Sequence, residues 1–93
     1  MDISIIIVSY NTKKLLDDCL SSVVRSMKLA KCTWEIIVVE NNSTDGTRQM
    51  LQKKHPTVKT ILNATNAGFG IANNQGIRVA SGEYVLFLNS DTI

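Results

Sequence analysis

Several features that assign a chain to a function class at a glance are scarce or missing here. The two cysteines, Cys19 and Cys32, have neither metal-ligand nor redox-motif spacing, so we interpret them as reduced structural thiols. The ten Lys and Arg exceed the eight Asp and Glu by only two and are scattered along the sequence, which argues against nucleic acid as a partner. No apolar run reaches the roughly 20 residues of a membrane span, and no secretion signal precedes the first apolar segment. We therefore expect a cytoplasmic protein, and we leave open a membrane association of a longer protein that contains this chain.

What the sequence does contain is a regular alternation of strand and helix patterns. Apolar, β-branched runs predict strands at residues 3–8, 35–40, 58–62 and 83–88, and amphipathic spacing predicts helices at about 13–27, 45–54 and 69–80. Strands without polar alternation are typical of a parallel sheet that is covered on both faces. Right-handed crossovers and a weak third strand at one edge lead to the strand order 3-2-1-4. We predict one α/β domain, a Rossmann-like three-layer sandwich with its switch point between the first and fourth strands.

Four polar loops then meet at the carboxyl ends of the strands, and we call this edge the rim. They are residues 9–11, 40–46, 63–70 and 89–91. Apart from Lys13 and Lys14 at its margin, the rim contains no Lys or Arg, and helix N-termini supply only about half a positive charge each. A diphosphate bound there would need a divalent cation, for which Asp91 is the candidate ligand. Taken alone, Asp91 could equally cap the segment that follows it.

Other rim residues allow two interpretations each. Glu40 ends a buried strand, where its carboxylate could accept the imide N–H of a uracil or thymine ring or could cap the next helix. The stretch Gly68-Phe69-Gly70 is similar to a dinucleotide glycine pattern, but Asn73 stands where the third glycine belongs and the third strand precedes it, so we interpret it as a tight turn. The amide of Asn73 needs partners, either backbone groups or a ligand. A phosphate-cradling loop ending in Gly-Lys-Ser/Thr is absent from the sequence.

Four sequence segments form a recognisable set: SIIIVSYN at 4–11, VVENNSTDGT at 38–47, NAGFGIANNQG at 66–76 and FLNSDT at 87–92. In this order, and over nearly the whole chain, they closely resemble the N-terminal half of family 2 glycosyltransferases, with rhamnosyltransferase-like members nearest. The resemblance implies a partial A-type glycosyltransferase (GT-A) fold. It also implies that the domain binds a UDP- or dTDP-sugar with Mg²⁺ or Mn²⁺, for glycosyl transfer to an acceptor hydroxyl in cell-surface polysaccharide biosynthesis.

The resemblance also implies roles for individual residues. Asp91 would bind the metal, and Glu40 would read the pyrimidine. The nucleotide-sugar site as a whole would comprise Ser9, Tyr10, Asn11, Glu40, Asn42, Asn66, Gly68, Phe69, Asn73, Asn74, Asn89 and Ser90. The chain departs from the family pattern twice, because Glu40 replaces the more usual Asp and Asn89 replaces the first acid of the Asp-x-Asp metal motif.

Catalysis itself would need more than these residues. In the family, the general base and the surface for a glycan or lipid-linked acceptor follow the metal motif, so we expect no catalytic residue within the chain and a domain that continues past Ile93. We therefore expect no transferase activity from the chain alone. The outer edge of the apolar fourth strand predicts self-association.

Three other interpretations compete. One is a non-catalytic nucleotide-binding fragment or degenerate homologue. A receiver-like signalling domain needs acids after the first strand, where this chain has Ser9-Tyr10-Asn11. A nucleotidyltransferase needs a Gly-rich, Arg-bearing loop at the same place, which is also lacking.

Overall fold

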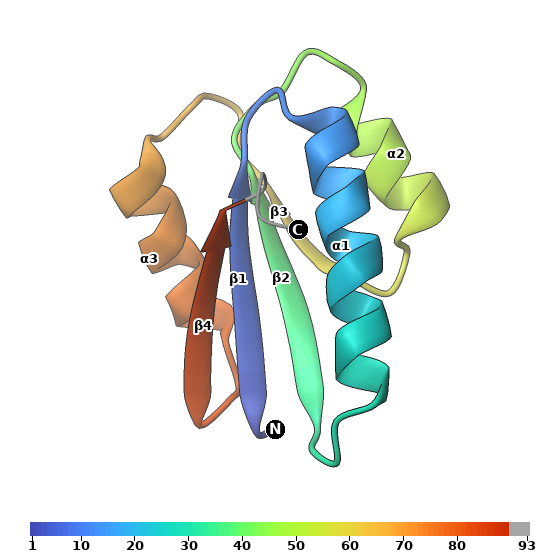
Figure 1. Cartoon of the computed structure of the whole chain (residues 1–93). Coiled ribbons are helices and arrows are strands. Elements are labelled where there is room, and N and C mark those ends of the chain that lie inside the picture. Colours follow the sequence, from blue (N-terminus) through green and yellow to red (C-terminus); the bar gives the residue numbers. More distant parts are fainter. Residues whose placement is uncertain (90–93) are drawn as a thin grey trace.

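The computed structural model describes residues 1–89 and shows the predicted alternation of strands and helices (Figure 1). Its elements are β1 (Ile3–Ser9), α1 (Lys13–Lys28), β2 (Trp34–Glu40), α2 (Thr47–Lys54), β3 (Lys59–Leu62), α3 (Phe69–Val79) and β4 (Tyr84–Asn89). The strands form one parallel sheet in the order β3-β2-β1-β4, which confirms the predicted topology. Most predicted boundaries agree with the observed ones within one residue.

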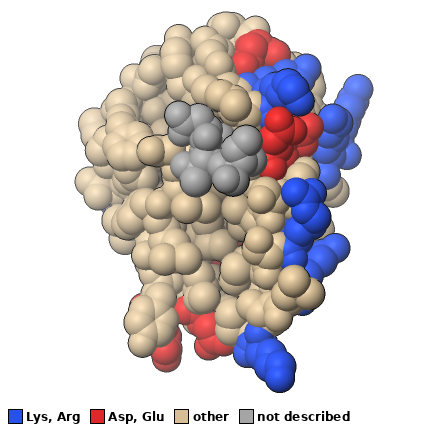
Figure 2. Space-filling model, viewed as in Figure 1, with Lys and Arg blue, Asp and Glu red and all other residues tan. Residues whose placement is uncertain are grey.

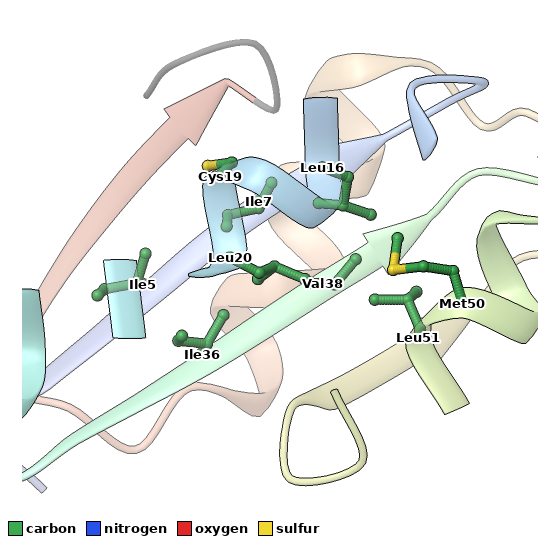
Figure 3. Packing of buried hydrophobic residues seen from close by; sticks show 9 residues of the cluster. All are labelled: Ile5, Ile7, Leu16, Cys19, Leu20, Ile36, Val38, Met50 and Leu51. Carbon is green, nitrogen blue, oxygen red and sulfur yellow. The ribbon is translucent and has the colours of Figure 1, made fainter. Parts of the chain in front are cut away.

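Helices α1 and α2 cover one face of the sheet (Figure 1). Alternate residues of β1 and β2, among them Ile7 and Val38, point to this face and meet Leu16 and Leu20 of α1 and Leu51 of α2 (Figure 3). All five are at most 2% exposed. Burying one such side chain contributes about 1.5–3 kcal/mol, so this layer is the main source of the hydrophobic stabilisation.

Helix α3 covers the opposite face and comes unusually close to β1. A Cβ atom added at Gly76 would lie 2.6 Å from Cγ2 of Ile6, nearer than such atoms normally approach. Only a residue without a side chain therefore allows α3 to pack at this distance. With α1 and α2 on one side and α3 on the other, the predicted three-layer sandwich is confirmed.

The start of α2 differs from the prediction. The helix was expected from residue 45 but begins at Thr47, because Gly46 has φ 88° and lies outside the helical region. Asp45 accepts hydrogen bonds from the Thr47 backbone N–H (3.2 Å) and from the Thr47 hydroxyl. Asp45 and Gly46 thus form the entry turn of the helix.

The side of the molecule formed by α3 and β4 exposes several apolar side chains. On α3, Phe69, Ile71 and Ile77 are 45–61% exposed, and on β4 Leu86 and Phe87 are 48–49% exposed. Within residues 1–89, β4 pairs only with β1, so its other edge has no strand beside it. None of the helices in this part of the chain is long and apolar enough to cross a bilayer.

Candidate functional site

The sheet register brings three predicted site residues into neighbouring positions. Ser9 pairs with Glu40 across β1 and β2, and Val8 pairs with Asn89 across β1 and β4. The carboxyl ends of these parallel strands therefore meet at one edge, as expected for the switch point. Ser9 and Glu40 are fully buried, whereas Asn89 is exposed to solvent.

The loop after β1 is tied to the loop after β2 through Asn11. The Asn11 backbone N–H donates to Oγ of Ser43 (2.8 Å), and Oδ1 of Asn11 accepts the N–H of Thr44 (2.8 Å). Asn11 has φ 51°, a conformation that Asn adopts more readily than most residues. The predicted site residue Asn11 thus shapes the rim, while the neighbouring Tyr10 is 48% exposed and faces solvent.

The carboxylate of Asp45 joins the same two loops. It accepts the backbone N–H of Lys13 (3.0 Å) as well as the two Thr47 donors. Burial raises the pKa of Asp45, but hydrogen bonds from the Thr47 hydroxyl and the Lys13 N–H outweigh this effect and hold the pKa below its usual value. Asp45 is therefore an ionised structural group at the start of α2.

Glu40 has internal partners for both carboxylate oxygens. Oε1 accepts the N–H of Ser43 (2.7 Å), and Oε2 accepts Nε of Arg48 (2.6 Å). The same guanidinium donates through Nη2 to the backbone carbonyl of Asn63. The bond to Ser43 corresponds to the capping interpretation of Glu40, and the fully buried carboxylate presents no surface to a ligand in this conformation. The base contact of Glu40 stays a prediction.

Arg48 is a rim residue that the sequence analysis missed. The rim loops themselves contain no Lys or Arg, as the sequence shows, but the Arg48 side chain reaches back from α2 to Glu40 and Asn63 and adds a positive charge that the sequence did not predict there. A buried carboxylate is expensive to leave without a cation. That rule, applied to Glu40 at the end of a buried strand, would have directed attention to the first basic residue of the following helix.

Three more amide side chains organise the third loop, and none was among the predicted site residues. Oδ1 of Asn41 accepts Nδ2 of Asn63 (2.8 Å) and the N–H of Ala67 (3.3 Å). Asn63 and Gln75 exchange two hydrogen bonds, of 2.8 and 3.0 Å. Asn41 is only 2% exposed, so these bonds satisfy a buried amide and connect the β2, β3 and α3 segments of the rim.

The predicted residues of the third loop are largely accessible. Oδ1 of Asn66 accepts the N–H of Gly68 (2.9 Å), and Gly68, with φ 82°, begins the turn into α3. Phe69 is 58% exposed, Asn74 is exposed and Asn73 is half-buried. Gly68 therefore forms the tight turn that the sequence predicted, while Gly70 lies in the first turn of α3. Asn42, with φ 67°, is likewise exposed at the rim.

The predicted metal ligand lies outside the described residues. Ser90 and Asp91 both follow residue 89. Within 1–89, no three His, Cys, Asp or Glu side chains are grouped to hold an ion. The rim there offers the side-chain amide oxygen of Asn89, a ligand type that suits Mg²⁺ or Mn²⁺, while the carboxylates of Glu40 and Asp45 already have protein partners. Asn89 fits a supporting role, and the charged ligand would be Asp91.

The comparisons with known proteins agree with this geometry. Residues 4–93 match the family described as Glycosyl transferase family 2. The chain belongs to this family of glycosyltransferases. The match covers the strand ends, the rim loops and α3, and it confirms the family that the four sequence motifs resemble.

Several relatives are named glycosyltransferases of bacteria. A poly(ribitol-phosphate) beta-glucosyltransferase of Bacillus spizizenii is 40% identical over 95 residues, which cover 98% of this chain and 15% of that protein. The UDP-Glc:alpha-D-GlcNAc-diphosphoundecaprenol beta-1,3-glucosyltransferase WfgD of Escherichia coli is 34% identical over 92 residues, covering 98% of this chain and 35% of that protein. The chain thus spans only a minor part of the length of these relatives.

Solved structures confirm the partial GT-A fold. Staphylococcus aureus TarS 1-349 in complex with UDP-GlcNAc has a TM-score of 0.85 and 34% identity, covering 98% of this chain and 27% of that one. The mannosyltransferase PcManGT from Pyrobaculum calidifontis, in complex with GDP-Man and Mn²⁺, has a TM-score of 0.79 and 26% identity, covering 96% and 27% of the two chains. The described fold therefore corresponds to the N-terminal part of a GT-A domain.

Proposed function

We propose that this chain is the donor-binding part of a glycosyltransferase that uses a UDP- or dTDP-sugar. One observation carries the proposal: the chain superposes over 98% of its length on a TarS structure solved with UDP-GlcNAc. The polar rim at the ends of β1, β2 and β4 supports it, since ligands of open α/β sheets bind outside the carboxyl ends of the strands.

The proposed residues divide by their accessibility and by the local structure that they already form. Six exposed residues would contact the nucleotide-sugar directly: Tyr10, Asn42, Asn66, Phe69, Asn74 and Asn89. Asn11 and Gly68 are exposed as well, but Asn11 bonds to Ser43 and Thr44 and Gly68 forms a turn, so these two would shape the pocket. The less exposed Ser9 and Asn73 would do the same, and Ser90 follows Asn89 in the sequence. A contact between Glu40 and a pyrimidine would require a rotation of the Glu40 side chain or a movement of loop 41–46, because Arg48 and Ser43 occupy its carboxylate here.

We also propose that the donor binds together with Mg²⁺ or Mn²⁺ held by Asp91. A diphosphate needs compensating positive charge, and Arg48 is the only guanidinium that reaches the rim in the described residues. Its donors already serve Glu40 and the Asn63 carbonyl. A bound divalent ion would supply the missing charge by neutralising the diphosphate oxygens.

Nucleotide titration followed by amide NMR tests the proposal. UDP, dTDP and GDP are each added to the ¹⁵N-labelled chain with and without Mg²⁺, and Mg²⁺-dependent UDP or dTDP shifts are expected at Tyr10 and Asn89. Asp91→Asn should remove the Mg²⁺ dependence. Asp2→Asn, an equivalent change at the opposite end of the sheet, should leave it intact. A chain that shows no nucleotide-dependent shift would leave only the non-binding alternative.

The acceptor half of the reaction is proposed on the family relationship. We propose a glycan or lipid-linked acceptor of cell-surface polysaccharide synthesis, including phosphate-bearing chains of the kind named for the Bacillus spizizenii relative. Because the chain spans 15–35% of the length of the two named relatives, we propose that the general base lies in sequence beyond these residues. Sustained sugar transfer by the purified 93-residue chain would contradict this division.

A further inference from the structure

A basic hollow lies beside the rim, between α1 and α2. It has a volume of about 910 Å³, and its lining includes Lys13, Lys14, Arg48, Lys53 and Lys54. Five of the ten Lys and Arg thus line one hollow. Of the seven Asp and Glu within residues 1–89, Asp17 alone lines it. The basic residues are scattered along the sequence, but the fold gathers half of them around this hollow. Figure 2 shows Lys and Arg concentrated on the side where Figure 1 places α1 and α2.

Some of these cations are already neutralised. Arg48 pairs with Glu40 (2.6 Å), Lys54 with Asp17 (3.0 Å) and Lys14 with Asp18 (3.3 Å). Lys13 and Lys53 have no ion-pair partner among the described residues. The three ion pairs cancel the charges of the paired cations. The ammonium groups of Lys13 and Lys53 therefore give the hollow a net positive charge.

The ammonium group of Lys13 lies close to the N-terminus of α2. Its Nζ lies 3.3 Å from the position that a Cβ atom on Gly46 would occupy, which puts the ammonium group over the entry turn of α2. The partial positive charge of the helix N-terminus is there as well. Lys53 lies in the last turn of the same helix. Lys13 and Lys53, which have no ion-pair partner among the described residues, thus lie at opposite ends of α2.

Polar side chains also line the hollow, alongside the aliphatic stems of the lysines. Ser43, Thr44 and Gln49 supply hydroxyl and amide groups that can bond to the hydroxyls of a sugar alcohol. Met50 is the only aliphatic lining residue of any length, and it is 5% exposed. A surface that inserts into a membrane carries exposed apolar side chains, and this lining has none. The hollow is also far larger than a single phosphate ion.

We propose that this hollow binds a phosphate-bearing polymer, with Lys13 and Lys53 contacting successive phosphate groups of the chain. The inference rests on the proposed function, since a polymer held here would lie next to the donor rim through Ser43 and Thr44 of loop 41–46. It goes beyond that function by assigning a separate binding surface for a polyanionic acceptor.

Two double variants, each of which removes two lysine charges, test this proposal. A short ribitol-phosphate oligomer is titrated into the chain, into Lys13→Gln/Lys53→Gln, and into Lys28→Gln/Lys31→Gln, which removes the same charge outside the hollow. The first variant should raise the oligomer Kd roughly tenfold and lower the slope of log Kd against log salt by about 2, one for each lost phosphate contact. The second should change the Kd less than about twofold, because screening limits the reach of its charges.

Titrations with three other anionic ligands test which class of molecule the hollow binds. Inorganic phosphate, single-stranded DNA and anionic phospholipid vesicles are expected to bind more weakly than the oligomer. Equal binding of any of these, or an equal loss in both variants, would overturn the proposal. UDP-induced shifts are followed on the same samples: if they persist while the oligomer fails to bind, only the polymer site is refuted. If they are absent while the oligomer binds, the donor site is refuted instead.

Discussion

The pair formed by Arg48 and Glu40 allows a quantitative prediction about stability. Glu40 is fully buried, and its Oε2 lies 2.6 Å from Nε of Arg48, which is itself 32% exposed. Removing one partner of a buried pair costs about 3–5 kcal/mol, because the other charge is left without compensation. Since Arg48 is partly exposed, we expect Arg48→Ala to lower the free energy of unfolding by about 3 kcal/mol.

A double-mutant cycle separates this pairing from general packing loss. Glu40→Gln alone should cost about 1 kcal/mol, because the guanidinium it leaves behind can still reach water and the Asn63 carbonyl. The double variant should then lose only about 2 kcal/mol, since no buried charge remains. The two effects would thus fall short of additivity by roughly 2 kcal/mol, which is the signature of direct coupling.

Urea unfolding monitored by circular dichroism measures each term. Lys14→Ala serves as the control, because the Lys14–Asp18 pair has side chains 87% and 43% exposed and should contribute less than about 0.5 kcal/mol. In thermal unfolding, the Arg48→Ala loss corresponds to a Tm lower by roughly 12–24 °C. A loss below about 1 kcal/mol for Arg48→Ala, or additive effects in the cycle, would refute the claim that Glu40 depends on Arg48.

Three further predictions follow from the fold. Gly76→Ala should destabilise the chain by about 1–3 kcal/mol despite the better helix propensity of Ala, because its Cβ would lie 2.6 Å from Cγ2 of Ile6. Unchanged urea unfolding would contradict this and would show that α3 can shift. The His55 hydrogen bond, with help from Lys54 and against the effect of burial, holds the pKa of Asp17 below its usual 3.8. Ionised Asp17 therefore stabilises the fold above its unfolded pKa, and this stabilisation is lost as the pH falls through the lower folded pKa. Asp17→Asn should reduce this loss of stability at acid pH in a series of unfolding curves measured at different pH. We also predict self-association through the edge of β4 that has no neighbouring strand within residues 1–89. Leu86→Lys should reduce it in analytical ultracentrifugation, and a monomer at every concentration would contradict it.

Much of the architecture could be predicted from local sequence patterns. Apolar runs identified the strands, 3.6-residue periodicity identified the helices, and the handedness rule for crossovers led to the observed strand order. The runs did not decide burial: β1 and β2 are buried, whereas the apolar β4, expected to be a buried strand, is largely exposed within residues 1–89. The strand ends then had to meet at one edge, so Ser9, Glu40 and Asn89 were expected together and are found together. The four motifs were sufficient to indicate the family. These features depend on the sequence within a few residues of each position and on general rules for connecting strands.

The pairing of side chains was decided only by the tertiary structure. Glu40 was expected to cap a helix or face a base, but its main partner is a guanidinium eight positions further along the chain, and Asn41, Asn63 and Gln75 form a network that no motif indicated. The lysines that line the hollow form two pairs, Lys13-Lys14 at the start of α1 and Lys53-Lys54 at the end of α2, which are far apart in the sequence. Such contacts depend on helix orientation and rotamers, which are set by packing across the sheet, so residues far apart in sequence acquire a common environment only when the layers assemble.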